Sequence, residues 1–169
     1  MIVSNNLLGK LRFPKETIVR VNLAWIKTLE EAQKILQESK YDVYLDYPQG
    51  RTKPPKPTIT LEEAMSLAKY KKVRYFAVSN VEDRDTVIEI RTHLPFGVKF
   101  VAKIETERGV NNLWYIYSTG VEYLMLDKED LYVNVGMDSN RYNELVDKVR
   151  DFSKSNKVTL FELQGVIFS

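Results

Sequence analysis

The chain has no cysteine, a single histidine and no apolar run long enough to cross a membrane. Without cysteine it can form neither disulfides nor thiolate metal ligands, which is compatible with a reducing compartment. Its first residues lack the continuous apolar core and the small-residue cleavage site of a signal peptide. These absences predict a cytoplasmic protein without a membrane partner.

A strong excess of charge of either sign is also lacking. The 25 Lys and Arg against 23 Asp and Glu leave a formal charge of +2, and the charges are interspersed along the chain. Nucleic acid is therefore not expected as a partner. The length of 169 residues favours one domain, which we place at residues 17–169 after an N-terminal arm of residues 1–16.

Short β-branched runs alternate with longer segments of helical period from residue 17 onward. This order is typical of an α/β fold, in which helices connect parallel strands. Capping-box spacings at Thr28–Glu31 and Thr60–Glu63 mark two helix starts. Residues 47–57 hold four prolines and one glycine, which predicts a long loop. The six predicted strands span residues 17–24, 41–46, 73–78, 98–104, 121–126 and 158–163.

Candidate functional residues collect where the fourth and fifth predicted strands end. Side chains alternate along a strand, so Lys103 and Glu105 point to the same side. Asp130 follows the fifth strand, and neighbouring strands lie about 4.8 Å apart. We therefore expect Glu105 and Asp130 within about 5 Å of each other, where two carboxylates would suit Mg²⁺ or Mn²⁺.

Purely structural roles are the alternative for the same residues. Lys103 and Glu105 can form an ion pair, and Asp130 can cap a turn. Residues of this kind at strand ends are often simple hydrogen-bonding groups. The same holds for three further polar residues at the ends of the first two strands, Arg20, Asn22 and Asp46.

Two segments, residues 103–110 (KIETERGV) and 125–131 (MLDKEDL), resemble the metal-site region of the phosphoenolpyruvate/pyruvate barrel superfamily. One branch, the citrate lyase β-subunit-like and HpcH/HpaI-type aldolases, is similar at residues 104–109 and at 129–131 followed by 135–136. That resemblance implies a metal held by Glu105 and Asp130, on which the enolate of a pyruvate-like substrate forms.

Pyruvate kinase is the other branch, and the sequence is similar to it at six polar positions. By this resemblance Arg20 would neutralise a substrate phosphate or carboxylate, and Lys103 would act on the enolate. Asn22 and Asp46 would hold an adjacent cation or substrate. The metal ligands would again be Glu105 and Asp130.

Departures from both branches limit what the resemblance implies. Pyruvate kinase has a lid domain after the position of Asp46, where this chain has only the proline loop, so pyruvate kinase activity is not expected. Both branches favour small residues just before Asp130, whereas this chain has Asp127 and Lys128. Their side chains are expected to intrude on the approach of a substrate.

The resemblance implies a partial (β/α) TIM-type barrel, because a complete barrel needs about 250 residues. Open strand edges favour pairing with another chain, so a homo-oligomer is expected. Residues 1–3 and 165–168 are apolar and are candidates to cover those edges. The predicted function is a metal-dependent lyase or aldolase acting on a small carboxylate or phosphate substrate. A degenerate barrel serving as a non-catalytic binding or assembly module is the alternative.

Overall fold

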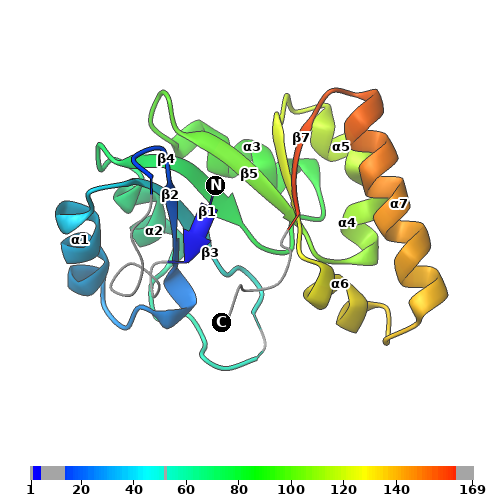
Figure 1. Ribbon diagram of the computed structural model, residues 1–169, viewed down its shortest axis with the longest axis horizontal. Coiled ribbons are helices and arrows are strands. Elements are labelled where there is room, and N and C mark those ends of the chain that lie inside the picture. The colour runs from blue at the N-terminus through cyan, green and yellow to red at the C-terminus, as the bar shows by residue number, and fades with distance from the viewer. Residues whose placement is uncertain (1, 5–13, 52, 163–169) are drawn as a thin grey trace. The chain divides into compact units, whose positions relative to one another are not determined.

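The computed structural model describes residues 2–4, 14–51 and 53–162, which fall into two compact units (Figure 1). The amino-terminal unit comprises Met1–Val78 with His93–Lys99, and the carboxyl-terminal unit comprises Ser79–Thr92 with Phe100–Ser169. Among the described residues no helix is both long and apolar enough to span a membrane.

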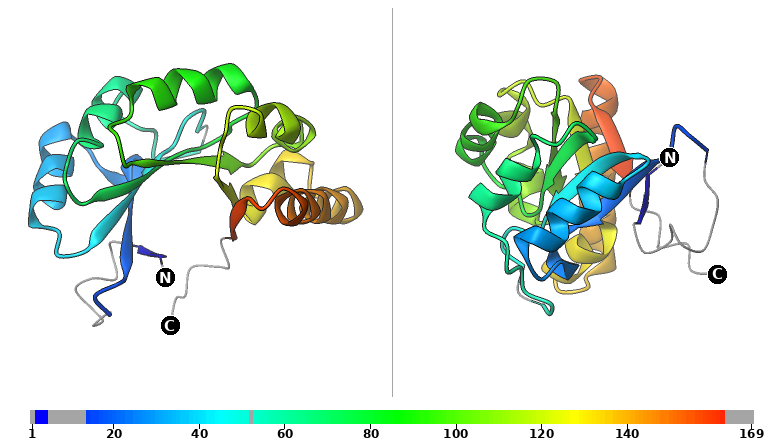
Figure 2. Two further views of the ribbon diagram at one scale, coloured as in Figure 1. Left: turned by 90° about the horizontal axis from the view of Figure 1, so that it is seen from above. Right: turned by 90° about the vertical axis from the view of Figure 1, so that its left-hand side faces the viewer.

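Four parallel strands with two helices form the framework of the amino-terminal unit. The strands pair in chain order, and α1 and α2 lie side by side on one face of them (Figure 2). A short 3-10 helix, η2, follows the second strand directly. The elements are β1 (Ile2–Ser4), β2 (Ile18–Asn22), η2 (Leu23–Trp25), α1 (Leu29–Glu38), β3 (Asp42–Tyr47), α2 (Leu61–Leu67) and β4 (Val73–Val78).

The carboxyl-terminal unit is built on three further parallel strands, again paired in chain order. The long helix α7 runs beside β6 and β7 (Figure 1). The elements are α3 (Arg84–His93), β5 (Lys99–Ile104), α4 (Glu107–Asn111), α5 (Leu113–Tyr117), β6 (Tyr123–Leu126), α6 (Lys128–Asn134), α7 (Ser139–Ser155) and β7 (Thr159–Glu162).

Burial along the strands follows their position in each unit. Burial alternates along β2: Val19 and Val21 are buried, and Ile18, Arg20 and Asn22 are partly exposed. β3 and β5 are buried almost continuously, as strands covered on both faces are. The polar residues Asp46 and Lys103 share this burial, so each must find a partner inside the fold.

The predicted α/β class with parallel strands is confirmed, but the described residues hold seven strands rather than six. The additional strand is β1, which pairs with β2 inside the segment assigned from the sequence to an N-terminal arm. Three residues are too few to show a periodic pattern. Residues 165–168, expected to cover a strand edge, lie outside the described residues.

Local sequence signals account for both helix starts predicted from capping boxes. At Thr60 the box is complete: its hydroxyl accepts from the amide of Glu63, and the Glu63 carboxylate accepts from the amide of Thr60. At Thr28 the hydroxyl accepts from Glu31, but the Glu31 carboxylate accepts from the Lys27 amide instead.

The described part of the proline-rich segment after β3 forms neither helix nor strand, as predicted. Its density of proline suggests a backbone without partners inside the loop, but the structure differs. Arg51 donates to the carbonyl oxygens of Pro54 and Pro55, at 3.0 and 2.9 Å. Since prolines supply acceptors but no N–H donors, a single guanidinium satisfies two of them.

Candidate metal centre

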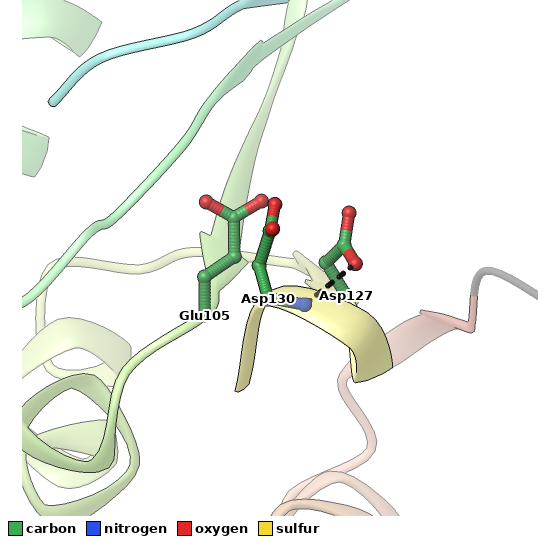
Figure 3. Close-up of side chains that lie close together, drawn as sticks. All are labelled: Glu105, Asp127 and Asp130. Carbon is green, nitrogen blue, oxygen red and sulfur yellow. Dashed lines mark hydrogen bonds between the residues drawn. The ribbon is translucent and has the colours of Figure 1, made fainter. Parts of the chain in front are cut away.

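Three carboxylates meet at the carboxyl ends of β5 and β6, in the carboxyl-terminal unit. Glu105, Asp127 and Asp130 each offer one oxygen atom, and these atoms all lie within 4.8 Å of one another. The side chains extend in the same direction (Figure 3). We call these three residues the acidic cluster.

The pairing of β5 with β6 explains why the cluster forms. Ile104 lies opposite Leu126 at the last paired position, so Glu105 and Asp127 leave neighbouring strands side by side. The chain then turns into α6 at once, and Asp130 lies in the first turn of that helix. Two strand ends and one helix start thus place three acidic residues together.

Asp127 also has a structural task, because it is the N-cap of α6. Its Oδ1 accepts a hydrogen bond from the backbone N–H of Asp130 at 3.3 Å. This bond satisfies one of the amides that a helix start leaves without an intrahelical partner. It also ties the side chain of Asp127 to the backbone of Asp130.

Burial of several carboxylates in one place is costly in free energy unless their negative charges are compensated. The exposed fractions of Glu105 and Asp127 are 2% and 7%, and Asp130 is partly exposed. Lys103 is buried as well, and its Nζ lies 2.7 Å from Oε1 of Glu105. Three carboxylates and one ammonium leave two formal negative charges, which a divalent cation would neutralise.

The turn after β4 holds both members of the Lys103–Glu105 pair. Lys103 Nζ donates to Oγ of Ser79 at 2.9 Å, and the backbone N–H of Asn80 donates to Oε2 of Glu105 at 3.0 Å. Asn80 adopts a φ of +53°, a left-handed conformation that asparagine tolerates better than most residues. The backbone amide of Val81 then bonds to the carbonyl of Lys103, at 3.1 Å.

The sequence therefore placed part of this centre correctly. The expected proximity of Glu105 and Asp130 is observed, and Lys103 and Glu105 do lie on the same side of β5. Asp127, expected to intrude on the approach of a substrate, is the third member of the cluster, and its effect on a substrate stays a prediction. Lys128 is directed to β7, where its Nζ lies 2.6 Å from Oε2 of Glu162.

The three remaining candidates lie in the amino-terminal unit. Arg20 donates to Oδ2 of Asp46 through Nε at 2.7 Å and also through Nη2. Asp46 is almost fully buried, with 1% exposed, so this ion pair compensates its charge inside the fold. Asn22 accepts from the Ala24 amide at 2.9 Å and caps η2. Substrate binding by these three residues stays a prediction.

The residue that follows Asp46 in β3, Tyr47, has a shifted pKa. Burial raises the pKa of Tyr47, the last residue of β3, because it disfavours the charged phenolate. The shift reinforces the neutral form of this hydroxyl, which can donate a hydrogen bond.

Comparison with known proteins identifies a similar fold but does not assign the chain to a family. No protein-family model matches the chain, and no curated protein sequence matches it. Among solved structures it is similar to RipC from Yersinia pestis, with a TM-score of 0.65 and 13% sequence identity. The match covers 86% of this chain and 68% of RipC. At this identity the likeness shows a shared fold.

Proposed function

We propose that the acidic cluster binds a divalent cation, Mg²⁺ or Mn²⁺, in the service of a lyase or aldolase reaction on a pyruvate-like or oxo-acid substrate. The observation that carries this proposal is the convergence of three carboxylate oxygens within 4.8 Å at two adjacent strand ends. Oxygen donors of this kind suit hard cations, which keep open positions for water and substrate.

The three carboxylates fit such a cation in their charge and in their position at the carboxyl ends of the strands. Glu105, Asp127 and Asp130 would hold it, and the carboxyl ends of parallel strands are where α/β proteins place their ligands. When bound, the cation would supply Lewis-acid polarisation of a substrate carbonyl. The same proposal includes two further points. The chain would be a member of the phosphoenolpyruvate/pyruvate barrel superfamily, and its fold would be a partial (β/α) barrel.

Lys103 is the group that we propose for stabilising or protonating an enolate. Its ammonium is buried, hydrogen-bonded to Ser79 and 2.7 Å from Glu105, so it is held in one place beside the cluster. A fixed positive charge in a site of low water content stabilises developing negative charge more than a mobile one does. Arg20 remains the proposed partner of a substrate carboxylate.

A specific observation favours the alternative of a non-catalytic binding or assembly module. The two cationic residues proposed for function, one in each unit, already have acidic partners, Lys103 with Glu105 and Arg20 with Asp46. Pairs of this kind are sufficient to explain why the charges are tolerated inside the fold. In such a module Glu105 would contribute to stability and not to metal binding.

Titration calorimetry with Mn²⁺ distinguishes the metal-binding function from the non-catalytic module. If the cluster binds the cation, Glu105→Gln abolishes binding of Mn²⁺, beyond any loss of stability that comes from breaking the buried pair with Lys103. If the cluster is only structural, the same substitution changes the melting temperature and leaves the Mn²⁺ titration as it was. Glu129→Gln is the matched control, because Glu129 lies in the same first turn of α6, is exposed and does not belong to the cluster.

Activity is tested once metal binding is established. A turnover screen with Mg²⁺ and pyruvate-like or oxo-acid substrates should detect carbon–carbon bond cleavage that Lys103→Met removes. Binding of pyruvate, oxalate or phosphoenolpyruvate without turnover would instead support the non-catalytic module.

A further inference from the structure

The strands of the amino-terminal unit all begin at one edge of their sheet. This edge lies at the other end of the strands from Asn22 and Asp46. Strands β2, β3 and β4 are parallel, with Ile18 beside Asp42 and Val43 beside Val73, so the turns that enter them share one edge. The start of β5 joins the same edge, because Lys99 Nζ lies 5.8 Å from the ring centre of Tyr75. We call this feature the lysine edge and define it as residues 14–17, 39–42, 68–75 and 94–99.

Positive charge is concentrated on the lysine edge. Its residues include six lysines and one arginine against two acidic residues, a formal charge of +5 where the whole chain has only +2. One of the acids, Asp42, is paired with the arginine, Arg74, at 3.0 Å. Within the described part of the chain, no ion pair joins an acidic side chain to Lys15, Lys40, Lys69, Lys71 or Lys72. Most of the charge on this edge is therefore available to a partner.

An apolar turn projects from the same edge. Residues 94–98 (LPFGV) have no polar side chain, and the turn is closed by a hydrogen bond from the amide of Val98 to the carbonyl of Pro95, at 3.1 Å. Gly97 takes a φ of +89°, which the turn needs and which side chains disfavour. Phe96, at the tip, has an exposed fraction of 108%, so its ring meets only solvent.

We propose that the lysine edge docks this protein on the surface of an anionic lipid bilayer. Phe96 would enter the boundary between head groups and acyl chains, and the surrounding lysines would meet the anionic head groups. Each element alone is ordinary on a protein surface. An unsupported aromatic ring at the tip of an apolar turn, together with uncompensated lysines on the same edge, is the combination that an interfacial anchor requires.

A bilayer fits these residues better than a nucleic acid does. Six of the seven basic residues on the edge are lysines, which act as point charges, whereas planar two-point contacts to phosphate favour arginine. Phe96 is also fully exposed, so among the described side chains no second ring packs on it to make a stacking platform. The lysines lie in four separate segments of the sequence, so no local pattern indicates a membrane surface. They meet only when parallel pairing aligns the strand starts.

Vesicle sedimentation tests this inference without reference to the acidic cluster. The full chain is mixed with vesicles of equal parts phosphatidylcholine and phosphatidylglycerol, or of phosphatidylcholine alone, in the presence of a chelator that prevents cation bridging. We expect binding to the anionic vesicles only, weakened by salt. Lys69→Glu combined with Lys71→Glu should lower the partition coefficient by roughly tenfold or more, and Phe96→Ser by about fivefold.

Matched variants control for charge and for apolar surface elsewhere. Lys34→Glu with Lys154→Glu makes the same change in net charge at two exposed sites off the edge, and Ile88→Ser removes an exposed apolar side chain of α3. Both should bind as the parent does. The inference is overturned if the chain does not sediment with anionic vesicles, or if the control variants lose as much binding as the edge variants. Tight binding to single-stranded RNA, with sedimentation independent of Phe96, would assign the edge to nucleic acid instead.

Discussion

Glu105 and Asp127 occupy equivalent positions on neighbouring strands: each directly follows one partner of the last paired position of β5 and β6, Ile104 opposite Leu126. This register brings two buried carboxylates together before any turn or helix intervenes. Asp130 joins them through the first turn of α6. The acidic cluster therefore depends first on strand pairing.

Asp127 combines two tasks that substitution can separate. Asparagine caps helices about as well as aspartate, so Asp127→Asn should keep α6 intact while removing one charge from the cluster. Mn²⁺ affinity should fall by at least tenfold with an almost unchanged melting temperature. Asp127→Ala should lose the cap as well, at a cost of about 1 kcal/mol in the free energy of unfolding. Calorimetry and urea unfolding of both variants measure the two effects separately. Equal Mn²⁺ binding by parent and Asp127→Asn would remove Asp127 from the proposed ligands.

Lys103 compensates the buried charge of Glu105 when no metal is present. Lys103→Met keeps most of the side-chain volume but leaves Glu105 without its closest cation, and breaking a buried pair costs about 3 kcal/mol. We expect a large fall in thermal stability without metal, and a rise on addition of Mn²⁺ greater than in the parent. A rise no greater than that of the parent would show that the cation does not reach Glu105.

Local rules were enough to predict part of the acidic cluster, but the register of the strands was needed for the rest. Alternation along one strand placed Lys103 and Glu105 on one side, and the ends of adjacent strands placed Asp130 near them. The resemblance to the barrel families predicts Asp127 to be an obstruction, whereas its position directly after β6 places it beside Glu105 once the register of β5 and β6 is known. Its place before two acidic residues in the DKED segment is a helix-start signal that, taken by itself, predicts α6.

Other assignments required the fold itself. Nothing local distinguishes an asparagine that binds a ligand from one that caps a 3-10 helix, which is what Asn22 does. Likewise, the pairing of Arg20 with Asp46 joins residues 26 positions apart and depends on β2 lying beside β3. Long-range partners of this kind are set by topology, which the sequence pattern specified only in outline.

Gly109 lies where α4 approaches the turn that holds the Lys103–Glu105 pair. A Cβ atom at this position would lie 2.7 Å from the carbonyl oxygen of Val81, a backbone atom that cannot move aside by rotating a side chain. Gly109→Ala should therefore destabilise the chain by about 2 kcal/mol, despite the better helix propensity of alanine. Asn111→Ala, at an exposed position of the same helix, is the control and should change stability much less. Urea unfolding that ranks the two variants in the opposite order would contradict the close packing.

The outer strands bear on the predicted homo-oligomer. Among the described residues β1 pairs with β2 alone and β7 with β6 alone, so each has one side without a strand partner. Such edges favour association with a second chain unless they are covered. Light scattering at tens of micromolar should show a dimer or larger species. A strictly monomeric protein at that concentration would show that the edges are protected within one subunit.

Glu162, the last residue of β7, should make stability depend on acid pH. Hydrogen bonds from Arg150 lower the pKa of Glu162 from 4.5 to about 2, with a further contribution from Lys128. Because the pKa in the folded protein lies below that of the unfolded chain, the ionised carboxylate stabilises the fold at every pH above about 4.5. That contribution declines as the pH falls from about 4.5 toward about 2, where both states become protonated.

Glu162→Gln, which cannot ionise, isolates this contribution. The variant should be less stable than the parent near neutral pH, and the difference between the two should shrink steadily across the acid range. Glu122→Gln is a matched control, since Glu122 is an exposed glutamate just before the neighbouring strand β6. Urea unfolding of parent and both variants at a series of pH values provides the measurement. A stability difference between parent and Glu162→Gln that stays constant down to the acid end would show that the Arg150–Glu162–Lys128 contacts do not set the pKa of this carboxylate.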